Sequence, residues 1–134
     1  MAITLVKKGT TDEFSFDGSG SDRINFGNVT LDDTGTPPEI ESTPLNVEIL
    51  ATTYLYDNVD LTIQSEQAGV DMKLSLDNST WFDALTSVQI GDIDATGSDQ
   101  RVDIYVKAEV ANDGTVSAGS ITAPDIRLTA TENQ

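Results

Sequence analysis

Hydrophobic and polar residues alternate strictly in four segments of the chain. The apolar positions of these segments are Val59, Leu61 and Ile63; Val70, Met72, Leu74 and Leu76; Val102, Ile104, Val106, Ala108 and Val110; and Ile126, Leu128 and Ala130. Because successive side chains of a strand point to opposite faces, each segment has one face for a core and one for water. This pattern predicts antiparallel sheets covered on one side, since the strands of parallel sheets are apolar on both faces.

Shorter segments that also favour strands lie between these four, separated by clusters of Gly, Asn, Asp and Pro that are typical of turns. We expect these strands over residues 3–6, 13–16, 23–30, 44–50 and 87–93. Residues 31–43 are expected to form a long exposed loop, and no segment has sustained apolar positions at helical spacing. The sequence of 134 residues therefore predicts one all-β domain over residues 1–134, an antiparallel β-sandwich with about seven to nine strands.

The charge and composition of the chain exclude several classes of function. Asp and Glu number 23 against 7 Lys and Arg, giving a net charge of -16, and the chain contains no His and no Cys. A surface this negative does not attract nucleic acid or an anionic membrane. Without His and Cys, the usual general base, the thiolate nucleophile and soft metal ligands are missing, so we expect a protein that is not an enzyme. The acidic excess also suggests adaptation to high salt, which screens self-repulsion, and an ordinary soluble acidic protein is the alternative.

The segment from Asp92 to Asp103 is the best candidate for a metal site. Asp92, Asp94 and Gly97 match the first, third and sixth positions of an EF-hand calcium loop, and Asp99 and Asp103 would add carboxylates. The last position holds Asp103 where a longer Glu is usual, and the flanks have the pattern of strands rather than helices. The alternative is an acidic turn between two strands; pairs such as Asp92 and Asp94 also arise by chance in so acidic a chain.

Aromatic residues give a second candidate site. Tyr54, Tyr56 and Trp81 could form a platform for a glycan or another partner, because aromatic faces suit stacking. Core packing is the alternative, and at Trp81–Phe82 one side chain should point inward and the other outward. Two N-glycosylation sequons, Asn28-Val29-Thr30 and Asn78-Ser79-Thr80, would matter only in a host that glycosylates the protein.

Several short motifs resemble immunoglobulin-like modules, and this resemblance implies that the predicted sandwich is of immunoglobulin-like type. The run from Ile24 to Thr30, followed by Pro44–Ile49 and Val59–Ile63, resembles the opening strands of hydin-type domains, and Lys73–Trp81 is similar to a hairpin of bacterial and viral immunoglobulin-like modules. The chain has no Cys pair, which excludes the disulfide-pinned antibody type.

A small acidic module of this kind resembles the accessory proteins of tailed bacterial or archaeal virus particles. The resemblance implies a capsid decoration, or cement, protein that binds the major capsid protein or other virion proteins. Such a protein is expected to form a homo-oligomer, and to be assembled in the host cytoplasm into the virion, because the N-terminus has no secretory signal pattern. A receptor- or glycan-binding module of a tail or surface protein is the alternative, and a tail-tube subunit is another.

Overall fold

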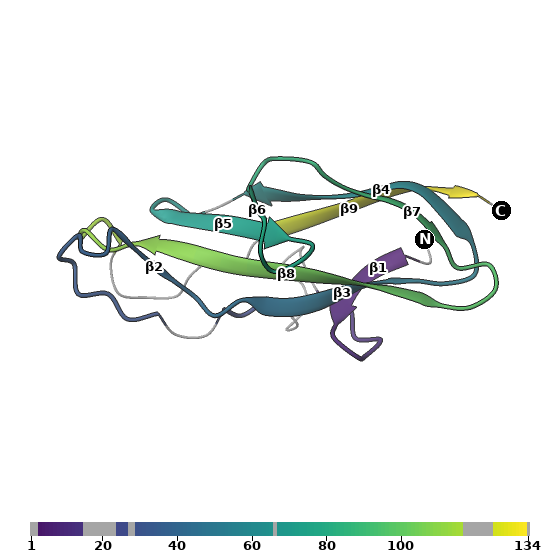
Figure 1. Ribbon diagram of the computed structural model, residues 1–134, viewed down its shortest axis with the longest axis horizontal. Helices are drawn as coiled ribbons and strands as arrows, with labels where there is room; N and C mark the ends of the chain where they lie inside the picture. The colour runs from purple at the N-terminus through teal and green to yellow at the C-terminus, as the bar shows by residue number, and fades with distance from the viewer. Residues whose placement is uncertain (1–2, 15–23, 27–28, 66, 117–124, 134) are drawn as a thin grey trace.

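The chain folds into β-strands joined by turns and loops (Figure 1). The computed structural model describes residues 3–14, 24–26, 29–65, 67–116 and 125–133. In chain order the strands are β1 (Ile3–Lys7), β2 (Glu39–Glu41), β3 (Leu45–Ala51), β4 (Leu55–Ser65), β5 (Val70–Ser75), β6 (Trp81–Asp83), β7 (Val88–Asp94), β8 (Gln100–Ala111) and β9 (Asp125–Asn133). No helix occurs among these residues, and hence none that could cross a membrane.

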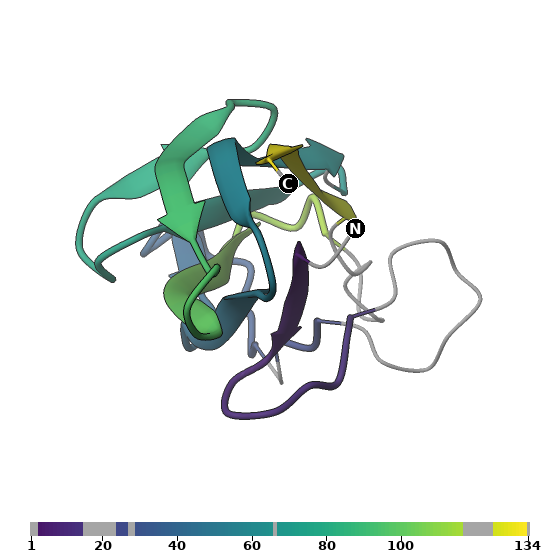
Figure 2. The ribbon, with the colours of Figure 1, turned by 90° about the vertical axis from the view of Figure 1, so that its right-hand side faces the viewer.

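The strands form two antiparallel sheets that pack as the two layers of a sandwich (Figures 1 and 2). Sheet A has the order β1-β3-β8-β5-β6, and sheet B has the order β7-β4-β9. In sheet A, β8 pairs with β5 along one edge and with β3 and β2, placed end to end, along the other. The prediction of an all-β antiparallel sandwich is confirmed, and the immunoglobulin-like type stays a prediction.

The alternating segments supply the core, as expected. The inward residues of β4, β5 and β8 are Val59, Leu61, Ile63, Val70, Met72, Leu74, Ile104, Val106, Ala108 and Val110, and all are buried in one cluster. On β9, Ile126 is buried and Leu128 and Ala130 are partly buried against the same cluster. The outward residues between them are mostly polar, so each strand has the one wet face that its sequence predicts.

The prediction of a long exposed loop over residues 31–43 is corrected by the structure. Residues 39–41 form β2, and Ser42 is buried, donating its N–H to the carbonyl oxygen of Ala108 over 2.8 Å. The preceding turn is held by Asn112, which is fully buried. Its Oδ1 accepts the N–H groups of Asp32 and Asp33 at 2.9 and 3.0 Å, and its Nδ2 donates to Asp32 Oδ1 at 2.8 Å and Pro37 O at 3.0 Å.

Two other expected strands fall partly outside the described residues. In the segment 13–16, Glu13 forms an isolated bridge to Val6, and residues 15 and 16 lie outside. In the segment 23–30, residues 23, 27 and 28 lie outside, so Asn28 of the first sequon is not described. The described residues of that segment form no strand, but Ile24 and Phe26 are buried in the core.

Candidate functional site

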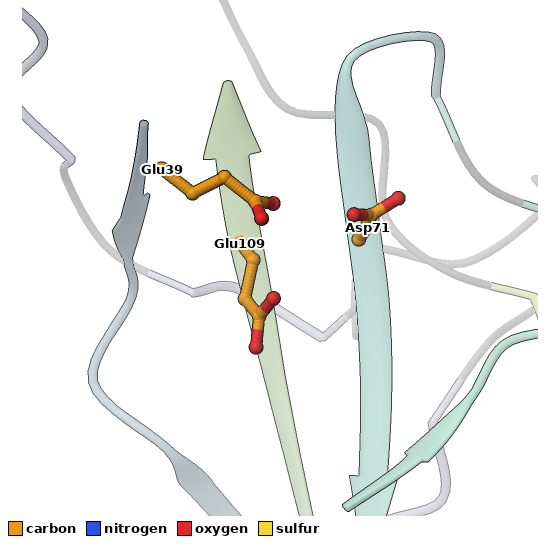
Figure 3. A group of neighbouring side chains, drawn as sticks. All are labelled: Glu39, Asp71 and Glu109. Atoms are coloured by element: carbon orange, nitrogen blue, oxygen red, sulfur yellow. The ribbon is translucent and has the colours of Figure 1, made fainter. Parts of the chain in front are cut away.

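Carboxylates crowd together on the outward face of sheet A, where β2, β8 and β5 lie side by side (Figure 3). Glu109 of β8 pairs with Glu41 of β2 on one side and with Asp71 of β5 on the other. Paired residues of antiparallel strands share a face, and this face is the outward one because the neighbouring Val110 is buried. Carboxylate oxygens of Glu39, Asp71 and Glu109 lie within 4.8 Å of one another, and we call these three residues the carboxylate cluster.

The crowding changes the electrostatics of the cluster. Partial desolvation raises the pKa of Glu39, and the negative charges of Asp71 and Glu109 raise it further, while Lys73 acts in the opposite direction. Carboxylate oxygens are the ligands that hard cations such as Ca²⁺ prefer. They are equally the acceptors that the guanidinium or ammonium group of a basic partner needs. The cluster could therefore hold either kind of positive charge.

Lys107 lies beside this cluster and is almost completely covered, with 8% of its side chain exposed. Its Nζ lies 3.0 Å from Glu41 Oε1 and 3.4 Å from Glu109 Oε1. It also lies 4.4 Å from the centre of the Trp81 ring, in the geometry of a cation–π contact. Lys107 therefore neutralises part of the acidic face from within the protein.

The face as a whole remains negative. Lys73 is occupied by an ion pair with Asp83 of the neighbouring strand β6. The carboxylates on this part of sheet A outnumber its two ammonium groups, Lys73 and Lys107; they belong to Glu39, Glu41, Asp71, Asp83 and Glu109. A partner that docks here meets an ordered acidic surface on paired strands.

Trp81 lies at the edge of the same face. It pairs with Ser75 of β5, which in turn pairs with Tyr105 of β8, so the three side chains form one outward row. The next residue, Phe82, pairs with the buried Leu74 and packs against the core. The prediction that Trp81 and Phe82 point to opposite faces is confirmed. Trp81 keeps a partly exposed ring, although the Lys107 ammonium covers one face of it.

The two tyrosines predicted to join Trp81 lie elsewhere. Tyr56 is fully buried and its hydroxyl donates to the carbonyl oxygen of Thr52 over 2.8 Å, while desolvation raises the pKa of this phenol. This burial removes Tyr56 from the predicted glycan contacts. Tyr54 is partly buried in the link from β3 to β4, where its carbonyl oxygen accepts the N–H of Ala95. The structure thus leaves Tyr54 and Trp81 in different parts of the sandwich.

The predicted calcium ligands are divided between the two sheets. Asp92 and Asp94 flank the buried Ile93 on β7 of sheet B, whereas Asp103 precedes the buried Ile104 on β8 of sheet A. Asp99 is exposed in the link between these strands. Within the described ranges, the carboxylates that converge closely enough for one ion are those of the carboxylate cluster instead.

The two carboxylates at the beginning of that segment have partners within the protein. Asp92 Oδ1 accepts the N–H of Asn58 at 3.0 Å. Asp94 Oδ1 accepts the hydroxyl and the N–H of Thr96 at 2.6 and 3.0 Å, bonds that lower the pKa of Asp94. Calcium binding between Asp92 and Asp103 stays a prediction, and a rise in melting temperature on adding calcium would test it.

Asp103 belongs to an ionic network that fastens the N-terminal loop to sheet A. Lys8 Nζ lies 2.8 Å from Asp103 Oδ1. Glu48 of β3, whose side chain is 10% exposed, accepts the N–H of Gly9 at 2.7 Å and Arg101 Nη1 at 3.1 Å. Arg101 also donates to the carbonyl oxygen of Thr10 at 2.9 Å. These basic side chains are therefore used to hold the fold together.

The carboxylate cluster was missed from the sequence because its members are 32 or more positions apart. Asp71 and Glu109 occupy outward positions of alternating segments, which is a signal that the sequence does carry. Glu39 lies in the segment expected to be a loop, and strand pairing alone brings it beside the other two. Alternation shows which face a residue occupies but does not show which strand lies next to it.

Comparison with known proteins gives little further information. No protein family model and no curated protein matches the sequence. The crystal structure of the C-terminal domain of a chitobiase from Bacteroides fragilis is similar over 100% of this chain and 93% of that chain, at 12% identity and a TM-score of 0.23. A likeness this weak carries no argument about function.

Proposed function

We propose that this chain is a non-enzymatic structural protein of a virion, a decoration protein that caps or bridges copies of the major capsid protein. The observation that carries the proposal is the excess of carboxylates on the outward face of sheet A, across β2, β8, β5 and β6. A negatively charged surface on paired strands steers a basic partner towards this face and fixes the position in which it binds. The same charge repels the nucleic acid that the shell encloses.

The architecture suits a protein that reinforces a shell. β8 runs through the middle of sheet A and is paired on both edges, so the acidic face is held by hydrogen bonds from three neighbouring strands. A decoration protein works by adding contacts between neighbouring subunits of the shell. A rigid binding face favours those contacts because little conformational entropy is lost when it binds. Assembly as a homo-oligomer, in the host cytoplasm and on an immunoglobulin-like sandwich, belongs to this proposal.

Isolated particles give the first test. The proposal expects the protein in purified virions at a fixed ratio to the major capsid protein, measured by quantitative mass spectrometry. A protein that is absent, or present only in traces, would rule out the decoration role.

Binding to particles stripped of the protein gives the second test. The double variant Glu41→Gln, Asp71→Asn should bind more weakly than the unmodified protein and lose less affinity as salt is raised. Asp99→Asn is the matched control, because it removes a charge from an exposed link away from that face. Equal losses for Asp99→Asn and for either single change on sheet A would argue against this docking face.

The second candidate function is a receptor- or glycan-binding module, and the partly exposed Trp81 favours it. Binding on a glycan array that disappears in Trp81→Ala and survives in Tyr54→Ala would support this alternative. If the protein is also missing from particles, the glycan-binding role would replace the decoration role.

A further inference from the structure

The hairpin between β5 and β6 carries the sequon Asn78-Ser79-Thr80 in an exposed turn. The turn is held by Asp77, whose Oδ1 accepts the N–H of Thr80 at 2.7 Å and the N–H of Ser79 at 2.9 Å. The Ser75 hydroxyl donates to the same oxygen at 3.0 Å, and the hydrogen bonds lower the pKa of Asp77. The carboxylate of Asp77 therefore supplies the bonds that shape the turn.

As a consequence, the two side chains that define a sequon are available. Asn78 and Thr80 are both exposed, and within the part of the chain that the structure describes neither the Asn78 amide nor the Thr80 hydroxyl has a hydrogen-bond partner. Asn78 has φ of 61°, a left-handed conformation that Asn tolerates better than most residues. A glycosyltransferase that reads Asn-x-Ser/Thr needs an accessible amide and an accessible hydroxyl two residues later.

We propose that Asn78 is an acceptor for N-linked glycosylation. In the reaction, Nδ2 of Asn78 forms a bond to the anomeric carbon of an activated sugar and gives one proton to a base of the transferase. The bond from that carbon to the donor's phosphate breaks. The leaving group is a nucleoside diphosphate when a nucleotide sugar is the donor, and a lipid pyrophosphate when the donor is lipid-linked.

This modification is independent of the decoration role and compatible with it. Ser75, which pairs with the first residue after the sequon, is four positions along β5 from Asp71 of the carboxylate cluster. At the rise of an antiparallel strand this separation is about 14 Å. A sugar at the hairpin tip would therefore leave the carboxylate cluster accessible.

Glycosylation of the purified full-length chain tests the proposal directly. The probe is a soluble cytoplasmic N-glycosyltransferase with UDP-glucose, and the readout is intact mass followed by peptide mapping. An Asn28→Gln background leaves Asn78 as the only sequon. We expect one hexose on the peptide that contains Asn78, no hexose in Thr80→Val, and a retained hexose in Thr80→Ser. Because the Thr80 hydroxyl has no structural partner, Thr80→Val should melt at the same temperature as its parent.

The protein isolated from its natural source supplies the second arm. A single hexose on Asn78 identifies a nucleotide-sugar donor, and a longer oligosaccharide identifies a lipid-linked donor; either supports the proposal. An unmodified Asn78 in the natural protein overturns it, as does an unmodified Asn78 in the reaction with purified enzyme when a standard acceptor peptide is glycosylated.

Discussion

Replacing Asn112 with Ala should destabilise the protein strongly, because its buried side chain makes several hydrogen bonds to a distant turn. Asn112 is fully buried at the end of β8, where its side chain holds the turn that precedes β2. Three of its hydrogen bonds join backbone groups, namely the N–H groups of Asp32 and Asp33 and the carbonyl oxygen of Pro37. At about 1 kcal/mol for each bond, the loss of these three bonds should lower the free energy of unfolding by about 3 kcal/mol.

Urea unfolding followed by circular dichroism measures this loss as a lower midpoint with an unchanged slope. The expected fall in melting temperature is roughly 10 °C for a domain of this size. Asn112→Asp separates the contributions, because it keeps the acceptor for the two N–H groups but sets a carboxylate against Asp32 Oδ1. Its stability should therefore recover as the pH falls and the carboxylates take up protons.

Asp113→Asn is the control at the position next to Asn112, since Asp113 is exposed and bonds only to Thr115 in the described structure. Asp113→Asn should change the free energy of unfolding by no more than about 0.5 kcal/mol. If Asn112→Ala has an effect as small as this, and the amides of Asp32 and Asp33 exchange with solvent no faster than before, the account of this turn is refuted.

Four other measurements test the electrostatics and the backbone. The folded pKa of Glu39 lies above its unfolded value of about 4.3, so ionised Glu39 costs stability once the pH rises through these two values. Glu39→Gln should therefore raise the melting temperature at pH 7 but not at pH 3. An equal gain at both pH values would contradict repulsion of Glu39 by Asp71 and Glu109. The folded pKa of Asp77 is lowered, so its carboxylate stabilises the fold above about pH 4 and this contribution is lost as the pH falls; Asp77→Asn should flatten the acid limb of a stability profile. Thr53 has φ of 76°, which is strained for a β-branched residue, and Thr53→Gly should raise the free energy of unfolding by about 1 kcal/mol, whereas a loss would show the strain to be absent. The net charge of -16 predicts a melting temperature that rises between low salt and ~1 M salt, and a flat series would contradict adaptation to salt.

The sequence predicts the strongly alternating strands and their core because side-chain direction in a strand is a local property. Val102 to Val110 shows this best: the alternation gives the strand, its inward residues and its outward acids, all as found in β8. The weaker strand over 87–93 is likewise found within one residue, as β7.

Long-range pairing limits what the sequence can predict. The segment around Glu39 has Pro and Gly before it and only three strand residues, so its local signal is that of a loop. Its structure depends on β8 and on the Asn112 side chain, more than 65 positions away. Tyr56 illustrates the same limit, because the sequence does not show that its ring lies in the core cluster.

The position of β8 also has a consequence for how the chain acquires its structure. β3 and β5 have no direct pairing with each other in sheet A, and both depend on β8, which follows them in the sequence. During synthesis, β3 and β5 must therefore wait until about residue 111 has left the ribosome before sheet A can close. Domains dominated by such distant pairings fold in milliseconds to seconds. Until β8 arrives, the apolar faces of β3 and β5 are exposed to aggregation, and the negative charge beside them keeps neighbouring nascent chains apart.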